Sequence, residues 1–146
     1  MCGASRLTLT QTPTARFFCH CEICQEVYGK PYSDATVVNA STVTISPDSP
    51  IIYENYWSGL QRGICSECQQ PVVGLLAIAP FIRAAFIPTI VLGERFTAPK
   101  ASAHIFYHRH LRPVVDDIPK INGFLKSELR AASIALSGVY GKTPNK

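Results

Sequence analysis

The stretch "FFCHCEICQ", residues 17–25, decides the fold because it places three cysteines within six positions. If this stretch begins extended, alternate side chains point the same way. Cys19 and Cys21 then share one face, and His20 points to the other. A turn over the next two residues returns Cys24 to the cysteine face. Three thiols therefore converge on one point, and the chain must fold around them.

A soft metal explains these thiols better than disulfide bonds do. The first residues have neither the basic start nor the apolar core of a secretory signal, so we expect a cytoplasmic protein. Six cysteines in that compartment argue against a disulfide framework. Thiolates gathered in one place need a cation, and tetrahedral Zn²⁺ suits them. Three protein ligands leave the fourth position open, as in catalytic zinc sites.

A second group of cysteines lies in "GICSECQQP", where Cys65 and Cys68 form a C-x-x-C half-site. Cys2 is the remaining cysteine, so the six divide into three and three. The rival division is one four-cysteine zinc ribbon that draws on both groups. The two groups lie about 40 residues apart, longer than the roughly 15 to 20 of ordinary ribbons. The rival also leaves one thiol unexplained, so we rank it second.

Composition indicates one folded domain of 146 residues, with 47% hydrophobic and 16% charged residues. The net charge of +4 is scattered, so nucleic-acid binding is not expected. The most apolar stretch, residues 71–93, carries Arg83 near its middle and is interrupted by prolines. A charge at the centre of a bilayer is costly. We therefore expect two buried strands joined by a turn near Pro80 and Arg83, and no membrane span.

Short runs rich in β-branched and aromatic residues, separated by turn residues, predict a mainly-β domain over residues 1–120. The second of these runs reads as one strand or as a bent pair. The expected strands cover residues 6–12, 34–46, 51–59, 72–79, 84–93 and 102–108.

The end of the chain predicts an amphipathic helix over residues 121–138 that packs on the same domain or on a second subunit, so a homodimer is one expectation. Gly138 is the expected stop, and residues 139–146 are expected to form a loose tail. The apolar residues of the expected packing face are Ile121, Phe124, Leu125, Leu129, Ala132 and Leu136.

Several motifs in order carry a family resemblance. "CHCEIC", "GICSECQQP" and "HIFYHRHLRPVVDDIP" resemble the glutathione-dependent formaldehyde-activating enzymes, a family that shares its domain with centromere protein V. "MCGASRLTL" looks like the end of the family's first motif, C-x-C-G-A. The likeness runs from Cys2 to Pro119. It implies a β-tent of small antiparallel sheets built around zinc.

The resemblance also implies two zinc ions. Cys19, Cys21 and Cys24 would hold the catalytic one. Cys2, Cys65 and Cys68 would hold the structural one.

Three departures from the family pattern stand out. The first cysteine of C-x-C would fall before Met1, so the fourth ligand of the structural zinc would be water, the amino terminus or nothing. Gln69 stands where the family usually has glycine. The helix after Pro119 is not a family hallmark.

The resemblance implies that the protein joins the thiol of glutathione to formaldehyde, a reaction that in reverse is a carbon–sulfur lyase reaction. A thiol bound at an open zinc position is deprotonated, so no strong general base is needed. We therefore interpret His20 as a brace for the ligands, Tyr28 as a core or rim aromatic, and His104 as a satisfied buried histidine. We expect Arg62, Arg109 and Arg112 to be solvated surface residues. They could also attract the carboxylates of a glutathione-like ligand.

Two other functions are alternatives for a chain with these cysteines. A non-catalytic zinc module that binds protein or nucleic acid would have a closed, four-ligand zinc. A methionine sulfoxide reductase on a similar fold would need a catalytic cysteine outside the metal sites, and none is left over here. Because thiols already add readily to formaldehyde, a thiol carrier or scavenger is a variant of the main hypothesis.

Overall fold

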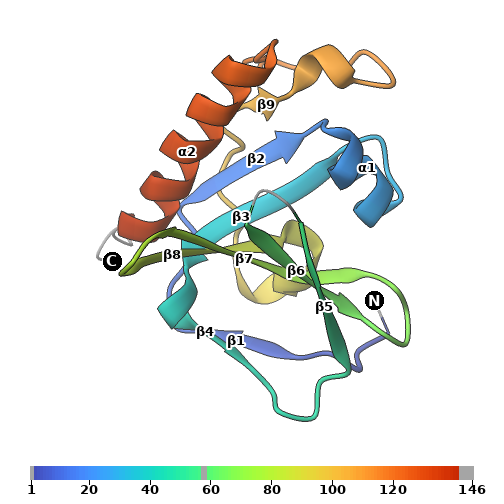
Figure 1. The fold of residues 1–146 in the computed structure, drawn as a ribbon, viewed down its shortest axis with the longest axis vertical. Coiled ribbons are helices and arrows are strands. Elements are labelled where there is room, and N and C mark those ends of the chain that lie inside the picture. The colour runs from blue at the N-terminus through green and yellow to red at the C-terminus, as the bar shows by residue number, and fades with distance from the viewer. Residues whose placement is uncertain (1, 57–58, 142–146) are drawn as a thin grey trace.

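A computed structural model describes residues 2–56 and 59–141 (Figure 1). The described chain is mainly β with a C-terminal helix, which confirms the predicted fold class. The strands are β1 (Leu7–Leu9), β2 (Ala15–Cys19), β3 (Ser33–Asn39), β4 (Val43–Ile45), β5 (Ile51–Asn55), β6 (Leu60–Cys65), β7 (Pro71–Ala79), β8 (Ile82–Pro88) and β9 (His104–Ile105). The helices are α1 (Glu22–Tyr28) and α2 (Phe124–Tyr140), with 3-10 turns η1 (Ala40–Thr42), η2 (Thr89–Arg95) and η3 (Tyr107–Arg109).

Seven strands form one sheet in the order β5-β6-β7-β8-β3-β2-β9, and β1 pairs with β4 in a separate two-stranded sheet. Neighbours are antiparallel except β2 and β9, which run parallel. This pair departs from the expected antiparallel pattern. It sets the short strand β9 beside the cysteine-bearing end of β2, and so ties a late segment of the chain to the first cysteine motif.

The apolar stretch over residues 71–93 forms the expected hairpin, because β7 and β8 pair antiparallel around a turn at Pro80 and Phe81. No helix among the described residues is both long and apolar enough to cross a membrane. The sequence overestimated the second strand of this hairpin, since the chain passes into η2 after Pro88. Gly93 adopts a φ of 60° inside η2, a conformation that glycine tolerates and that a continuing strand excludes.

Four further strand predictions differ in extent. The run at residues 6–12 is a strand only at Leu7–Leu9. The run at residues 34–46 is a bent pair, in which η1 separates β3 from β4. The run at residues 51–59 ends as a strand at Asn55, and its positions 57–58 lie outside the described residues. The late run at residues 102–108 is a strand only at His104 and Ile105, because the following 3-10 turn ends the pairing.

The helix α2 forms as expected, but the predicted packing face is wrong. Leu125 and Leu129 are 69% and 65% exposed, whereas Ile134 is 4% exposed. The buried side of α2 carries small residues that allow the helix to approach the sheet closely. At Gly138, an added Cβ would lie 2.5 Å from the Cβ of Val37 on β3. The face of α2 that packs on the sheet is therefore the one whose small residues allow close approach, and the face with the larger leucines stays exposed.

Gly138 is not the stop that the sequence suggested, because the helix continues to Tyr140. The predicted loose tail is therefore wrong at residues 139–140, and residues 142–146 lie outside the described part of the chain. In Figure 1, α2 (red) crosses β2 and β3 on one side of the sheet.

Buried side chains cover both faces of the sheet. On the face under α2, Phe17, Val37 and Ile134 form a core that extends to Cys19 and Cys24. On the opposite face, a second core is built from Val38, Val73, Ala85, Ile87 and Leu92. The first cysteine group thus sits at the edge of the larger core, held by packed structure on several sides.

Candidate metal centre

Strand β2 places Cys19 in a rigid position. Alternate residues of β2 are buried, and Cys19 is 4% exposed at its carboxyl end. Its Cα pairs with that of Ser33 on β3 and with that of Ile105 on β9, so the strand is supported on both edges. The first thiol is therefore fixed by the sheet.

The other two thiols of this group are positioned by the start of α1. Cys21 is the N-cap residue, and its Sγ accepts a hydrogen bond of 3.5 Å from the backbone N–H of Cys24. The turn that the sequence suggested after Cys21 is thus the first turn of a helix. A side-chain acceptor at the N-cap satisfies an N–H that the helix itself leaves unpaired. The contact between the N–H of Cys24 and the Sγ of Cys21 therefore both caps helix α1 and brings these two cysteines together.

Together these elements bring the Sγ atoms of Cys19, Cys21 and Cys24 within 4.8 Å of one another. We call these residues the first cluster. Four sulfur ligands at about 2.3 Å from a tetrahedral zinc would lie about 3.8 Å apart, so the arrangement fits that ion. Among the described residues, no fourth histidine, cysteine or carboxylate joins the cluster.

The first cluster lines a cavity of about 400 Å³. This volume lies within the range of small-molecule sites, about 300 to 1,000 Å³. Strands β2, β6, β7 and β8, helix α1, and helix α2 contribute to its walls. A position beside the three thiols is therefore reachable by a small molecule.

A buried arginine also lines this cavity. Arg62 on β6 is 9% exposed, and its Nη2 lies 3.4 Å from the Sγ of Cys24. Its guanidinium group also stacks on the ring of Tyr56, with 4.7 Å between Cζ and the ring centroid. Hydrogen bonds from the neighbouring Cys19 and Cys21 thiols, with a smaller contribution from the charge of Arg62, lower the pKa of Cys24 well below its ordinary value. The cluster therefore favours a thiolate at Cys24.

Arg62 was expected to be a solvated surface residue, and this prediction is wrong. Strand β6 lies between β5 and β7, and Arg62 is on the face of the sheet that lines the cavity. No local pattern in the sequence marks this residue, because its contact with Cys24 depends on the tertiary structure that brings β6 to the same cavity as α1. Arg109 is half exposed, and its Nη1 pairs with Glu22 at 2.9 Å. Arg112 is exposed, as expected.

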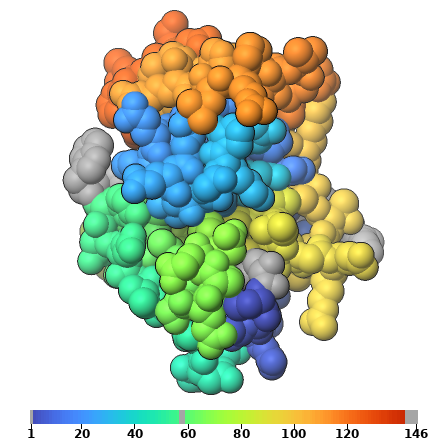
Figure 2. All heavy atoms as spheres, turned by 90° about the vertical axis from the view of Figure 1, so that its right-hand side faces the viewer, coloured from blue at the N-terminus to red at the C-terminus, as the bar shows by residue number. Residues whose placement is uncertain are grey.

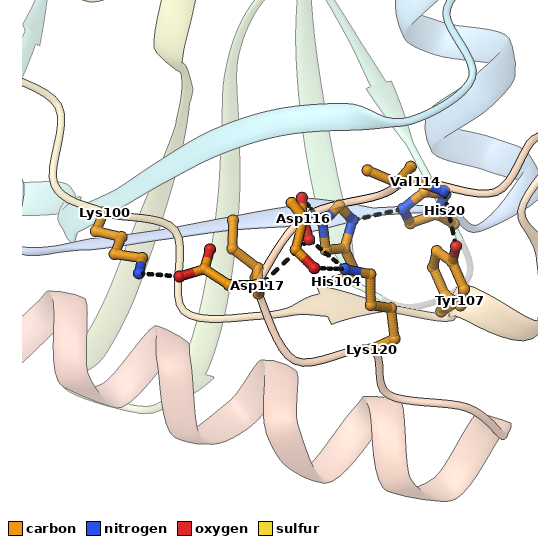
Figure 3. A network of polar contacts seen from close by, with 9 residues as sticks. His20, Lys100, His104, Tyr107, Val114, Asp116, Asp117 and Lys120 are labelled. Carbon is orange, nitrogen blue, oxygen red and sulfur yellow. Dashed lines mark hydrogen bonds and ion pairs between the residues drawn. The ribbon is translucent and has the colours of Figure 1, made fainter.

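His20 points away from the first cluster into a chain of polar contacts (Figure 3). Its Nε2 lies 2.9 Å from Nδ1 of His104, and Nε2 of His104 lies 2.9 Å from the carboxylate of Asp116. Asp116 also pairs with Lys120. When Nε2 of His104 donates to Asp116, its Nδ1 is available to accept from Nε2 of His20. Burial, with a smaller effect of His104, lowers the pKa of His20 to about 4, so the ring is neutral at pH 7.

The expected roles of these histidines agree with the structure. His104 is fully buried and both ring nitrogens have partners. His20 braces the segment between Cys19 and Cys21 and supplies no atom to the cluster. Tyr28 lines the cavity, and its burial raises its pKa.

Cys2, Cys65 and Cys68 form the second cluster, with Sγ atoms also within 4.8 Å of one another. The Sγ atoms of Cys2 and Cys65 are 3.7 Å apart, close to the spacing that a shared zinc requires. Cys65 ends β6, and the N–H of Gln69 returns to the carbonyl of Cys65 at 2.8 Å. Figure 2 shows the first residues of the chain lying against this turn between β6 and β7.

Gln69 has a φ of 58°, in the left-handed region that favours glycine. The turn therefore keeps the backbone shape expected of a glycine at this position, with glutamine in its place. The two clusters are separate, so the rival single four-cysteine ribbon is wrong.

A mainly-β fold with two three-thiol clusters, one of them opening on a cavity, defines a class of small β proteins whose cysteines could hold metal ions. The sequence profile of the glutathione-dependent formaldehyde-activating enzymes matches residues 1–109. The chain therefore belongs to that family, as its motifs suggested. A search of curated proteins found no match. The match ends before α2, so the helix lies outside the residues that define the family.

Proposed function

We propose that the protein is a zinc-dependent enzyme of carbon–sulfur bond chemistry, acting on the adduct of formaldehyde with a small thiol such as glutathione. The observation that carries the proposal is the first cluster, whose three thiols face a cavity without a fourth protein ligand among the described residues. Family membership supports the reaction class. The second cluster is proposed to hold a structural zinc.

Each residue has a distinct task in this proposal. Cys19, Cys21 and Cys24 would hold the catalytic zinc, which when bound supplies a Lewis acid that favours the thiolate form of a substrate thiol or polarises an aldehyde oxygen. Arg62 offsets the negative charge of the thiolates from inside the cavity. His20 and its partners hold the ligand segment in place.

The reaction balances without any further reactant. In the direction of synthesis, a bond forms between the sulfur of the thiol and the carbon of formaldehyde. The carbon–oxygen double bond becomes a single bond, and the thiol proton ends on that oxygen. In the lyase direction the carbon–sulfur bond breaks, and thiol and formaldehyde are released.

Metal analysis of purified variants tests this proposal. We expect about two zinc ions per chain in the unaltered protein and about one in Cys24→Ala, because each cluster has the donor set for one ion. Cys68→Ala is the matched control, since it should also lose one ion but from the second cluster.

Calorimetric titration with glutathione and with 2-mercaptoethanol, a small thiol, then separates the clusters. At least one thiol should bind the unaltered protein and Cys68→Ala but not Cys24→Ala. Binding that persists in Cys24→Ala would contradict the proposal. Two bound zinc ions with no thiol binding at all would favour the non-catalytic zinc module.

A further inference from the structure

The positive charges that line the cavity beside the first cluster already have partners. Arg62 lies against the Sγ of Cys24, and the charge of the cluster occupies it. Arg109 is paired with Glu22. Among the described residues, these are the cations that line the cavity, and the remaining charged side chain there is that of Glu128. A ligand carboxylate would therefore have to compete with Cys24 for Arg62 or with Glu22 for Arg109, and it would meet the carboxylate of Glu128, which is unpaired among the described residues.

The rest of the cavity surface is mostly apolar. Side chains from the sheet form one side, with Phe17 on β2, Leu60 on β6, Leu76 on β7 and Phe86 on β8. Glutathione carries two carboxylates and an ammonium group at neutral pH. Moving unpaired charges onto such a surface is costly, whereas an apolar group gains free energy in proportion to the area that it buries.

Helix α2 completes this surface from outside the family-matched residues. Phe124, Glu128 and Ala131 from α2 line the cavity, and Phe124 is 53% exposed at its edge. Its ring lies against Phe106, with 5.9 Å between the ring centroids. Leu125 is the adjacent residue and is more exposed, but it does not line the cavity. Among the described residues of α2, Phe124, Glu128 and Ala131 therefore line the cavity, and their neighbours on the helix do not.

From these observations we infer that the thiol handled by this protein carries an uncharged, apolar substituent, and that α2 selects it through Phe124 and Glu128. The inference rests on the proposed function, because it places the thiol at the first cluster. It differs from the family description in the substrate, since the walls of this cavity suit a hydrocarbon group better than a charged peptide.

Calorimetry on the zinc-loaded protein tests the inference with three thiols. The probes are 2-phenylethanethiol, which is apolar, glutathione, which is charged, and 2-mercaptoethanol, which is too small to reach the walls. We expect 2-phenylethanethiol to bind about tenfold or more tightly than glutathione. Tighter binding of glutathione would overturn the inference and leave the proposed function standing. Absence of binding by all three would overturn both.

Variants of α2 test the role of the helix. Phe124→Ala should weaken binding of 2-phenylethanethiol by about three- to tenfold and leave 2-mercaptoethanol unchanged. Leu125→Ala is the matched control and should change neither. Glu128→Lys should strengthen glutathione binding, because it replaces the free anion with a cation. Equal effects of Phe124→Ala and Leu125→Ala, or no gain in Glu128→Lys, would overturn the role assigned to α2.

Discussion

Asp116 is the residue on which the polar chain behind the first cluster ends. Its carboxylate accepts from Nε2 of His104 and from the N–H of Ile118 at 3.1 Å, and it pairs with Lys120. These contacts, led by Lys120 and then His104, hold the pKa of Asp116 well below its ordinary value of 3.8. Through His104 and His20, this one carboxylate fixes the orientation of a ring that lies between two cysteines of the cluster.

The sign of the pH dependence follows from the direction of that shift. A carboxylate with a lower pKa in the folded state stabilises the fold fully above its unfolded pKa of about 4, and the contribution is lost as the pH falls below it. Asp116→Asn removes this contribution. We expect the variant to have a lower melting temperature at pH 6, and the difference from the unaltered protein to shrink at pH 3, as measured by thermal unfolding.

Asp117→Asn is the control for this experiment. Asp117 pairs with Lys100 on the surface, where both side chains are more than 70% exposed. Surface pairs contribute little, so this variant should melt close to the unaltered protein at both pH values. A gap for Asp116→Asn that stays constant from pH 6 to pH 3 would show that its carboxylate does not carry the effect.

At this scale the sequence predicted the grouping of the cysteines well and their surroundings poorly. The spacing within "CHCEIC" is short enough that local geometry alone brings three thiols together. Arg62 and Asp116 meet the motif only through strand pairing and a distant segment, and no local pattern encodes such contacts. The absence of His20 from the cluster could be predicted because alternation in a strand is local.

At the scale of elements, helix α2 presents two apolar faces, and only one of them is buried. We expect Ile134→Ala to lower the free energy of unfolding by about 2 to 5 kcal/mol, since Ile134 is 4% exposed and its loss leaves a cavity. Leu129→Ala should change it by less than about 0.5 kcal/mol, since Leu129 is 65% exposed. Urea unfolding measures both.

A large cost for Leu129→Ala that depends on protein concentration would instead indicate that this face is covered in a homodimer. A large cost at every concentration would contradict the orientation of α2 within one chain. Periodicity predicted that a helix forms here but not which face is buried, because Leu125, Leu129 and Leu136 make the stronger apolar pattern. The buried face depends on how closely Gly138 can approach β3, which only the tertiary structure decides.

At the scale of the whole molecule, β6 connects the two clusters. Arg62 contacts the first cluster and Cys65 belongs to the second, three residues apart on one strand, or about 10 Å. The mainly-β class and the division of the cysteines could be predicted because turn residues and cysteine spacing are written in the sequence. The parallel contact of β2 with β9 could not, because it joins residues 18–19 to residues 104–105.

The two clusters should release metal at different rates, because they differ in burial. Cys2 is exposed, and segments with few buried contacts open locally at low free-energy cost. Cys19 and Cys24 are buried and held by the sheet and α1. After addition of a chelator, we expect zinc release in two phases, with the fast phase absent in Cys68→Ser and the slow phase absent in Cys24→Ser. The second cluster joins Cys2 to the turn between β6 and β7. Loss of the zinc that is released in the fast phase should therefore also lower the melting temperature of the protein. If Cys68→Ser removed the slow phase instead, the first cluster would be the more labile one, and burial would not control metal retention in this fold.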